Sequence, residues 1–250
     1  MTRKTRDRVL LLLATLVLWK SLTLLLTLDV QLFPPPETVA KLLVEDRTVF
    51  LESLVSSFVL LLAGGILAVV TAIPLGLLVG WQRRLYDVFE PVMNILGPVP
   101  PIVYIPYAIV LLPTFRSASI FIIFIGAFWP LFLNTVIGVR GVERGLLHSA
   151  STLGVGKGTM LWRILLPGAM PQILAGGTIS LVMSFILLTA AEMIGATSGL
   201  GWYVKNFADF ADYPRVVAGI VVIGLVVSAL MVLYNGLAAY LLRWRPVRRD

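Results

Sequence analysis

A glycine-rich stretch with a lysine is the part of this sequence whose residue types most resemble a chemical site. Residues 148–167 read HSASTLGVGKGTMLWRILLP, and 154–159 within them look like part of a phosphate-binding loop. Such a loop requires G-x-x-x-x-G-K-[ST] after a strand. Here Ser151 stands in place of the first glycine and Gly158 follows Lys157 in place of serine or threonine. The stretch therefore predicts no nucleotide site.

Histidine and cysteine chemistry is almost absent from the chain. It has no cysteine and one histidine, His148. The lack of cysteine excludes disulfides and thiolate metal sites. A single histidine argues against a histidine metal centre or a Ser-His-Asp triad. We therefore expect no catalytic residues, no metal site, no cofactor of its own and no enzymatic activity.

The composition is that of a membrane protein. Of its 250 residues, 58% are hydrophobic and 13% charged, and the mean hydropathy is +0.95, whereas soluble domains are about 25% charged. A membrane-spanning helix needs about 20 mostly apolar residues. This predicts a single all-α integral membrane domain over 1–250 with six transmembrane helices. The apolar runs are 9–28, 54–80, 91–112, 117–139, 170–195 and 216–242.

The basic residues predict the orientation. If both termini are cytoplasmic, fourteen of the twenty lysines and arginines lie in cytoplasmic segments, as the positive-inside rule requires. The net charge of +7 then reflects topology and contact with anionic lipid rather than nucleic-acid binding. The first run follows a basic segment, as in a signal peptide. We interpret it as an uncleaved anchor, because it is long and no small-x-small cleavage site follows it.

The segment 140–167 has the pattern of two short helices joined at glycines. Apolar residues fall on one face at helical spacing, and Gly154 stands where a helix C-cap is expected. A second apolar face follows, and Pro167 is expected to end that helix and turn the chain back into the membrane. The pattern fits an interfacial amphipathic loop or a docking element for a soluble partner. The apolar positions are Leu146, Leu147, Ala150 and Leu153, then Met160, Leu161, Ile164 and Leu165.

At these residues the sequence resembles the inner-membrane subunits of ABC importers. Their cytoplasmic motif is E-A-A-x3-G-x9-I-x-L-P, and the spacing here from residue 148 through Gly154 to 164–167 is the same. His148 and Ser149 replace the first two motif residues. In that family the motif forms the coupling helix that docks on the ATPase. The positions that the resemblance assigns to coupling are His148, Ser149, Ala150, Leu153, Gly154, Ile164, Leu166 and Pro167.

Further segments resemble the nitrate/sulfonate/taurine branch of these permeases. The resemblance implies a type I, MetI-like fold in which 1–53 form the first helix and a periplasmic connection, 54–245 the core and 140–167 the cytoplasmic coupling loop. Residues 111–116 depart from the branch's usual aromatic-glycine segment. The matching segments are 98–101, 104–106, 128–130, Asn134, 138–142 and 191–201.

Proline and polar residues in the expected spans are candidates for a translocation pathway. Prolines within 97–106 should break the helix, which is tolerated at membrane depth only inside protein or beside a watery cavity. Ladders of small residues at 64–80 and 176–184 fit either helix packing or a pathway. Glu192 could face the pathway or pair with Lys205. The candidate pathway residues are Pro98, Pro100, Pro101, Tyr104, Asn134, Ser180, Ser184 and Glu192.

The resemblance also implies function and partners. It predicts a permease of an ATP-driven, binding-protein-dependent importer for a small anionic or organic solute, in the bacterial inner membrane. The partners would be a second copy of the chain in a homodimer, two cytoplasmic ATPase subunits that bind ATP and magnesium, a periplasmic or lipid-anchored solute-binding protein, and membrane lipid. The alternative is a secondary transporter driven by an ion gradient. It is disfavoured because Glu192 is the only acidic residue in the expected spans and no inverted repeat is visible.

Overall fold

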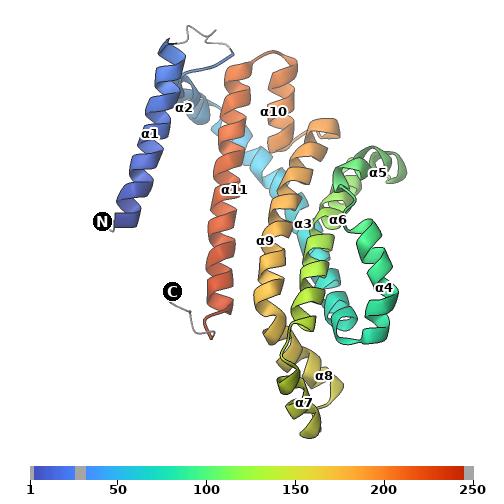
Figure 1. Ribbon diagram of the computed structural model, residues 1–250. Helices are drawn as coiled ribbons and strands as arrows, with labels where there is room; N and C mark the ends of the chain where they lie inside the picture. Colours follow the sequence, from blue (N-terminus) through green and yellow to red (C-terminus); the bar gives the residue numbers. More distant parts are fainter. Residues whose placement is uncertain (1–2, 26–31, 245–250) are drawn as a thin grey trace. The chain divides into compact units, whose positions relative to one another are not determined.

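The computed structural model describes residues 3–25 and 32–244, and it is all-helical over them (Figure 1). This confirms the all-α prediction. In chain order the helices are α1 (Arg3–Leu25), α2 (Pro36–Glu45), α3 (Arg47–Trp81), α4 (Arg83–Leu96), the 3-10 turn η1 (Pro101–Tyr104), α5 (Ile105–Leu111), α6 (Phe115–Arg140), α7 (Arg144–Thr152), α8 (Lys157–Thr159), the π-helical turn η2 (Met160–Leu165), α9 (Leu166–Gly195), α10 (Leu200–Asp209) and α11 (Tyr213–Leu241).

The described residues contain four helices long and apolar enough to cross a membrane, namely α3, α6, the continuous run Lys157–Gly195 and α11. There are five if α4 and the η1–α5 segment, bent by 80° at their junction, form one broken span. The apolar part of α1 is shorter, Leu13–Leu24, and 26–28 of the first expected span lie outside the described residues. Six spans with cytoplasmic termini therefore stay a prediction.

The chain divides into two compact units, and the boundary between them falls within α3, α9 and α11. The first unit comprises Met1–Ser57 and Glu192–Val226. The second comprises Phe58–Ala191 and Val227–Asp250. The second unit holds the predicted coupling loop and most of the candidate pathway residues, whereas the first holds Glu192.

In the second unit, α6 packs closely against both α3 and α9 through small residues. A Cβ atom added at Gly76 of α3 would lie 2.6 Å from Cβ of Thr135 in α6. One added at Gly176 of α9 would lie 2.5 Å from Cβ of Asn134 on α6. Such close approach is how helices associate in lipid, where apolar burial supplies little driving force. These contacts confirm helix packing as the role of the small residues concerned.

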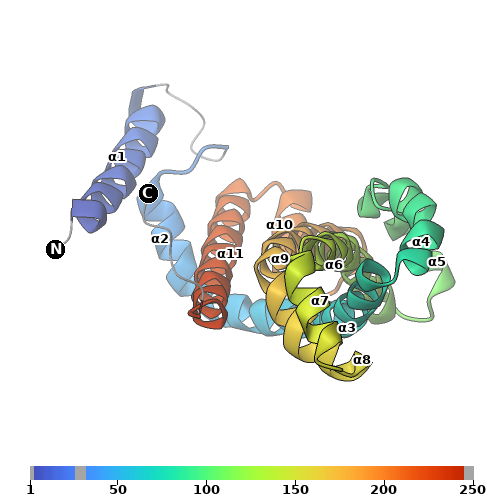
Figure 2. The same ribbon diagram turned by 60° about the horizontal axis from the view of Figure 1, so that its bottom comes forward.

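At one end of α6 and α9, the short elements α7, α8 and η2 form a compact projection (Figure 2). Ala150 of α7 and Met160 of η2 are buried in the same apolar cluster as Val139 of α6 and Ile173 of α9. The projection is therefore attached to the helices by packing, and its orientation relative to them is fixed by that cluster.

The first unit has its own core around Tyr203 of α10, which is fully buried. Its ring lies 4.4 Å from that of Phe50 in α3, measured between centroids. α2 begins at Pro36, whose fixed φ suits the first helical turn. Lys20 of α1 forms an ion pair with Glu37 of α2, and the hydrogen bond from Lys20 lowers the pKa of Glu37.

Candidate functional site

The predicted coupling loop is built on a helix terminated by Gly154. Gly154 has φ +69, a left-handed conformation that costs glycine little. Its N–H donates to the carbonyl oxygen of Ser151 at 3.1 Å, and the N–H of Val155 donates to that of Ala150 at 3.1 Å. These two bonds form a Schellman motif, the commonest way to end a helix with a glycine. The predicted C-cap is therefore confirmed, and it sets the direction in which the chain leaves α7.

The apolar residues of α7 do not form one buried face. Ala150 is buried and Leu147 is half-buried against the second unit's core. Leu146 and Leu153 instead point outward, with exposed fractions of 50% and 82%. Trp162 of η2 is also exposed, at 57%. The projection thus carries an unburied apolar surface, which we call the α7 surface and define as Leu146 and Leu153.

The expectation that Pro167 ends the second short helix is wrong. The chain is helical without interruption from Lys157 to Gly195, and Pro167 is the second residue of α9. A proline normally clashes with the carbonyl four residues earlier, here that of Arg163. That residue lies inside the π turn η2, whose wider winding gives the ring space. His148 and Ser149 are exposed on α7, and Ile164 and Leu166 are half-buried.

The predicted break in the proline-rich segment is present. α4 ends at Leu96, Pro100 precedes η1, and the chain bends by 80°. Pro98 and Pro100 are exposed, while Pro101 and Tyr104 are half-buried. The break leaves non-helical backbone in a segment otherwise apolar enough to span a membrane. Such backbone must be covered by protein or water, so a pathway role stays a prediction that the geometry permits.

The remaining pathway candidates of the second unit fall into two places. Asn134 of α6 donates from Nδ2 to the carbonyl oxygen of Pro130 at 2.7 Å and accepts from Nε2 of Gln172 at 2.8 Å. Ser180 and Ser184 are buried, and their hydroxyls donate to carbonyl oxygens of Ala127 and Ser180 at 2.7 and 2.8 Å. The serine hydroxyls are therefore engaged by the backbone. Gln172 was missed from sequence, although a polar residue directly after Pro171 in a span is a signal.

Glu192 is held in a closed pocket of the first unit and is 1% exposed. The Ser57 hydroxyl donates to its Oε1 at 2.6 Å, and the Gly201 N–H donates to its Oε2 at 2.8 Å. The Leu200 N–H donates to Oγ of Ser57 at 2.9 Å. Because α10 starts at Leu200, these are the unpaired amides of a helix N-terminus, which favour an acidic partner. Glu192 therefore caps α10.

Glu192 does not pair with Lys205, which was one of the two roles considered for it. Lys205 instead pairs with Asp209, one turn further along α10. The chain reverses at Gly199, whose φ is +123, and a Cβ atom there would lie 2.4 Å from Cδ of Glu192. This reversal brings the start of α10 back onto the end of α9, so the carboxyl group finds backbone amides before it can reach a lysine.

Comparison with known proteins decides the family. A family model described as "binding-protein-dependent transport system inner membrane component" matches residues 72–245. The chain belongs to this family. The resemblance identified at residues 148–167 is thereby confirmed, and the chain is an inner-membrane permease component.

Relatives of the permease include proteins named for the transport of taurine and of nitrate. It is 31% identical over 235 residues to the taurine transport system permease protein TauC of Escherichia coli, covering 91% of this chain and 85% of the relative. It is 30% identical over 159 residues to the nitrate import permease protein NrtB of Synechocystis, covering 64% of this chain and 58% of the relative. These matches confirm the predicted branch.

The fold of the permease is also seen in a solved structure. A chain of the inward-facing MetNI methionine ABC transporter superposes with a TM-score of 0.67 at 17% identity, covering 79% of this chain and 98% of that chain. This confirms the predicted MetI-like fold.

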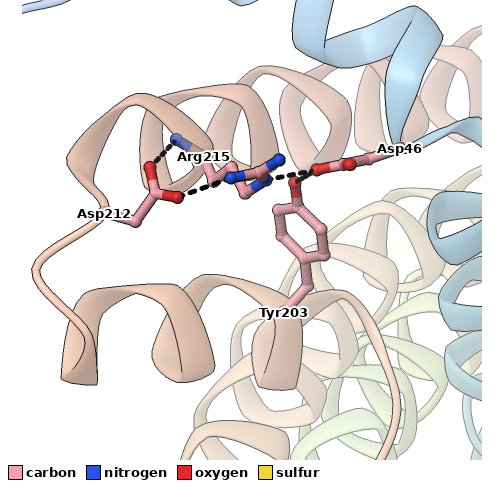
Figure 3. A network of polar contacts seen from close by, with 4 residues as sticks. All are labelled: Asp46, Tyr203, Asp212 and Arg215. Atoms are coloured by element: carbon pink, nitrogen blue, oxygen red, sulfur yellow. Dashed lines mark hydrogen bonds and ion pairs between the residues drawn. The ribbon is translucent and has the colours of Figure 1, made fainter.

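A polar network that sequence reasoning missed joins α2, α10 and α11 of the permease (Figure 3). Oδ2 of Asp46 accepts from the Tyr203 hydroxyl at 2.6 Å and from Nε of Arg215 at 2.9 Å. Nη1 of Arg215 donates to Oδ2 of Asp212 at 2.7 Å. Burial, and next the hydrogen bond to Asp46, raise the pKa of Tyr203, so its hydroxyl stays a donor. The only local sequence signal is Asp212, a typical N-cap before Pro214.

We expect Arg215→Ala to lower the free energy of unfolding of the permease by about 1–3 kcal/mol, because it removes the guanidinium group that pairs with both Asp46 and Asp212. Partial exposure of Arg215, 32%, keeps the loss below that of a fully buried pair. The matched control is Lys205→Ala, which breaks a more exposed pair and should cost under about 0.5 kcal/mol. Denaturant titration in micelles measures both, and equal losses would contradict a structural role for the network.

Proposed function

We propose that this chain is the permease subunit of an ATP-driven importer and that the α7 surface is the site where a cytoplasmic ATPase docks. The observation that carries the proposal is the geometry of the projection. A Schellman turn at Gly154 fixes the end of α7, and α7 and its C-cap residue present Leu146 and Leu153 outward. Leucines on the outer face of a short helix are suited to a hydrophobic groove of a partner protein. The motif spacing at 148–167 supports the same assignment.

In this proposal the chemistry of ATP belongs to the partner. The permease offers no phosphate-binding loop, so two ATPase subunits would hold ATP and magnesium, one on each copy of a permease homodimer. Closure of the ATPases would move the two α7 surfaces. Because Ala150 and Met160 anchor the projection in the core of the second unit, this movement would be passed to α6 and α9. The result is alternation between inward- and outward-facing states.

A solute-binding protein would deliver the solute on the periplasmic side of the bacterial inner membrane. Taurine and nitrate are named for the relatives, and both carry an anionic group. We therefore propose a small anionic or organic solute for this permease. The secondary-transport alternative gains no support, because Glu192 is fully engaged with Ser57 and Gly201, whereas ion-driven carriers need ionisable groups that face a pathway.

Gly154→Pro should uncouple ATP hydrolysis from transport. Proline cannot adopt the positive φ of Gly154, and it removes the N–H that is bonded to the carbonyl oxygen of Ser151. The chain should therefore leave α7 in a different direction. We expect solute-stimulated ATPase activity of the reconstituted complex to fall about tenfold or more. A tenfold fall corresponds to a loss of about 1.4 kcal/mol of coupling free energy.

The control for this measurement is Gly156→Ala, since Gly156 has φ −67 and no atom within 4 Å of an added Cβ. It should retain wild-type stimulation. Wild-type stimulation in Gly154→Pro would remove the support for α7 as the coupling element.

The broken segment at 97–106 should be wet in at least one state of the transport cycle. Single cysteines at Val99, Ile102 or Tyr104 in this cysteine-free chain should react with a water-soluble maleimide. Trapping the ATPase in its closed state should change their rates by roughly tenfold, as expected when a dominant conformation becomes a minor one. Leu60 of α3, buried at 6% exposure, provides the control cysteine and should stay unreactive. Labelling that does not depend on the state would exclude this segment from the pathway.

A further inference from the structure

An apolar cleft of about 700 Å³ lies within the second unit, between α3, α9 and α11. These three elements can be followed in Figure 1. We propose that this cleft binds an acyl chain of an anionic phospholipid and that arginines beside one end of it hold the headgroup.

The wall of the cleft offers no free polar group to a water-soluble solute. Three hydroxyls reach it, those of Ser180, Ser184 and Tyr234. Each donates to a backbone carbonyl, with distances of 2.7, 2.8 and 2.7 Å. The rest of the lining is apolar side chains and small residues. A ligand that gains by leaving water and needs no hydrogen bonds is therefore the chemistry that fits.

The position of the cleft indicates where such a ligand comes from. α3, the run that contains α9, and α11 are long and apolar enough to cross a membrane. In the most apolar 18-residue stretch of each, only 28%, 39% and 11% is buried, respectively. Their outer faces therefore meet hydrocarbon, and a cleft between them is filled from the hydrocarbon phase. The lining residue Gly65 has no atom within 4 Å of an added Cβ, so the cleft is open beside it.

Residues at one end of the cleft suit an anionic headgroup. Trp162 and Leu241 both line it. Trp162 lies in η2, directly before α9, and Leu241 is the last residue of α11. Arg163 is the residue after Trp162, and Arg243 lies two positions after Leu241. Both arginines are exposed. The sequence has no acidic residue in 157–172 or 227–244. Tryptophan is enriched at the membrane interface, and arginines at that level attract lipid phosphate.

The test measures phospholipid retained by the full chain. The protein is purified from vesicles of equal phosphatidylglycerol and phosphatidylcholine, and native mass spectrometry counts the lipid bound per chain. Wild type should retain phosphatidylglycerol. Gly65→Phe places a ring in the open space and should lower retention at least about tenfold, because each displaced methylene is worth about fourfold in affinity. Gly236→Phe is the matched control, on α11 but outside the lining, and should retain lipid as wild type does.

The headgroup part is tested separately. Arg163→Gln and Arg243→Gln should each lower the preference for phosphatidylglycerol over phosphatidylcholine by about fivefold, while Arg83→Gln leaves it unchanged. Circular dichroism checks that each variant is folded. Wild-type retention by Gly65→Phe would overturn the proposal. It would also be overturned if Gly65→Phe converted a dimer into monomers, because that result would show that a second chain covers the cleft in the wild type. Equal retention of both lipids by wild type would overturn the anionic headgroup.

Discussion

Glu192→Ala is expected to lower the free energy of unfolding by about 2–5 kcal/mol. The substitution removes both acceptors of a buried site and leaves the Gly201 N–H without a partner and the Ser57 hydroxyl without its acceptor. Each buried polar group left unsatisfied costs about 1–3 kcal/mol. Unfolding in mixed micelles with increasing dodecyl sulfate measures the change. A loss below about 0.5 kcal/mol would show that Glu192 does not hold α10 to α9.

Gly199 provides an independent check on the same contact. Gly199→Ala places a methyl group 2.4 Å from Cδ of Glu192 at a φ of +123, so it should destabilise the fold through a clash and through backbone strain. Removing the carboxyl group relieves the clash, so Glu192→Ala combined with Gly199→Ala should cost less than the sum of the two single losses by about 1 kcal/mol or more. Gly224→Ala, where an added Cβ has no atom within 4 Å, is the control. Additive losses would contradict direct contact.

Leu153→Asp is expected to abolish association with the ATPase. Leu153 is the C-cap residue of α7 and is 82% exposed, so the substitution removes no buried contact in the isolated subunit and should leave its stability within about 0.5 kcal/mol. In a hydrophobic groove, loss of an anchoring side chain costs about 2 kcal/mol or more, and a buried unpaired charge adds to it. We therefore expect affinity for the ATPase to fall about 100-fold or more.

Val44→Asp is the matched control, because Val44 is 62% exposed on α2 and lies outside the projection. It should retain the ATPase in co-purification. Undiminished co-purification by Leu153→Asp would mean that the α7 surface is not the docking site.

Features encoded by local spacing could be predicted from the sequence. Gly154 was identified as a helix terminus because an apolar helical pattern stops one residue before it, and the Schellman bonds confirm this. The break after Leu96 follows from prolines that lack N–H donors. The family motif at 148–167 also depends only on spacing along the chain.

Features that depend on long-range contacts could not be predicted. Ser57 lies 135 residues before Glu192 and its hydroxyl is the acceptor of the Leu200 N–H, which no local pattern indicates. Asp46 and Arg215 are 169 residues apart. Pro167 was misinterpreted for a different reason. Proline usually ends a helix, but the preceding π turn gives its ring space, and no residue type in 160–165 marks a π turn.

The measurement that tests the central claim most directly is a site-specific crosslink from α7 in cells. A single cysteine is placed at Leu153 in the cysteine-free chain, coupled to a short photoactivatable group and irradiated, and the attached protein is identified by mass spectrometry. We expect a nucleotide-binding ATPase subunit to be attached at this position, and none from a cysteine at Ile220, which is 56% exposed on α11. Attachment from residue 153 to lipid alone, or to a protein without a nucleotide-binding domain, would contradict it.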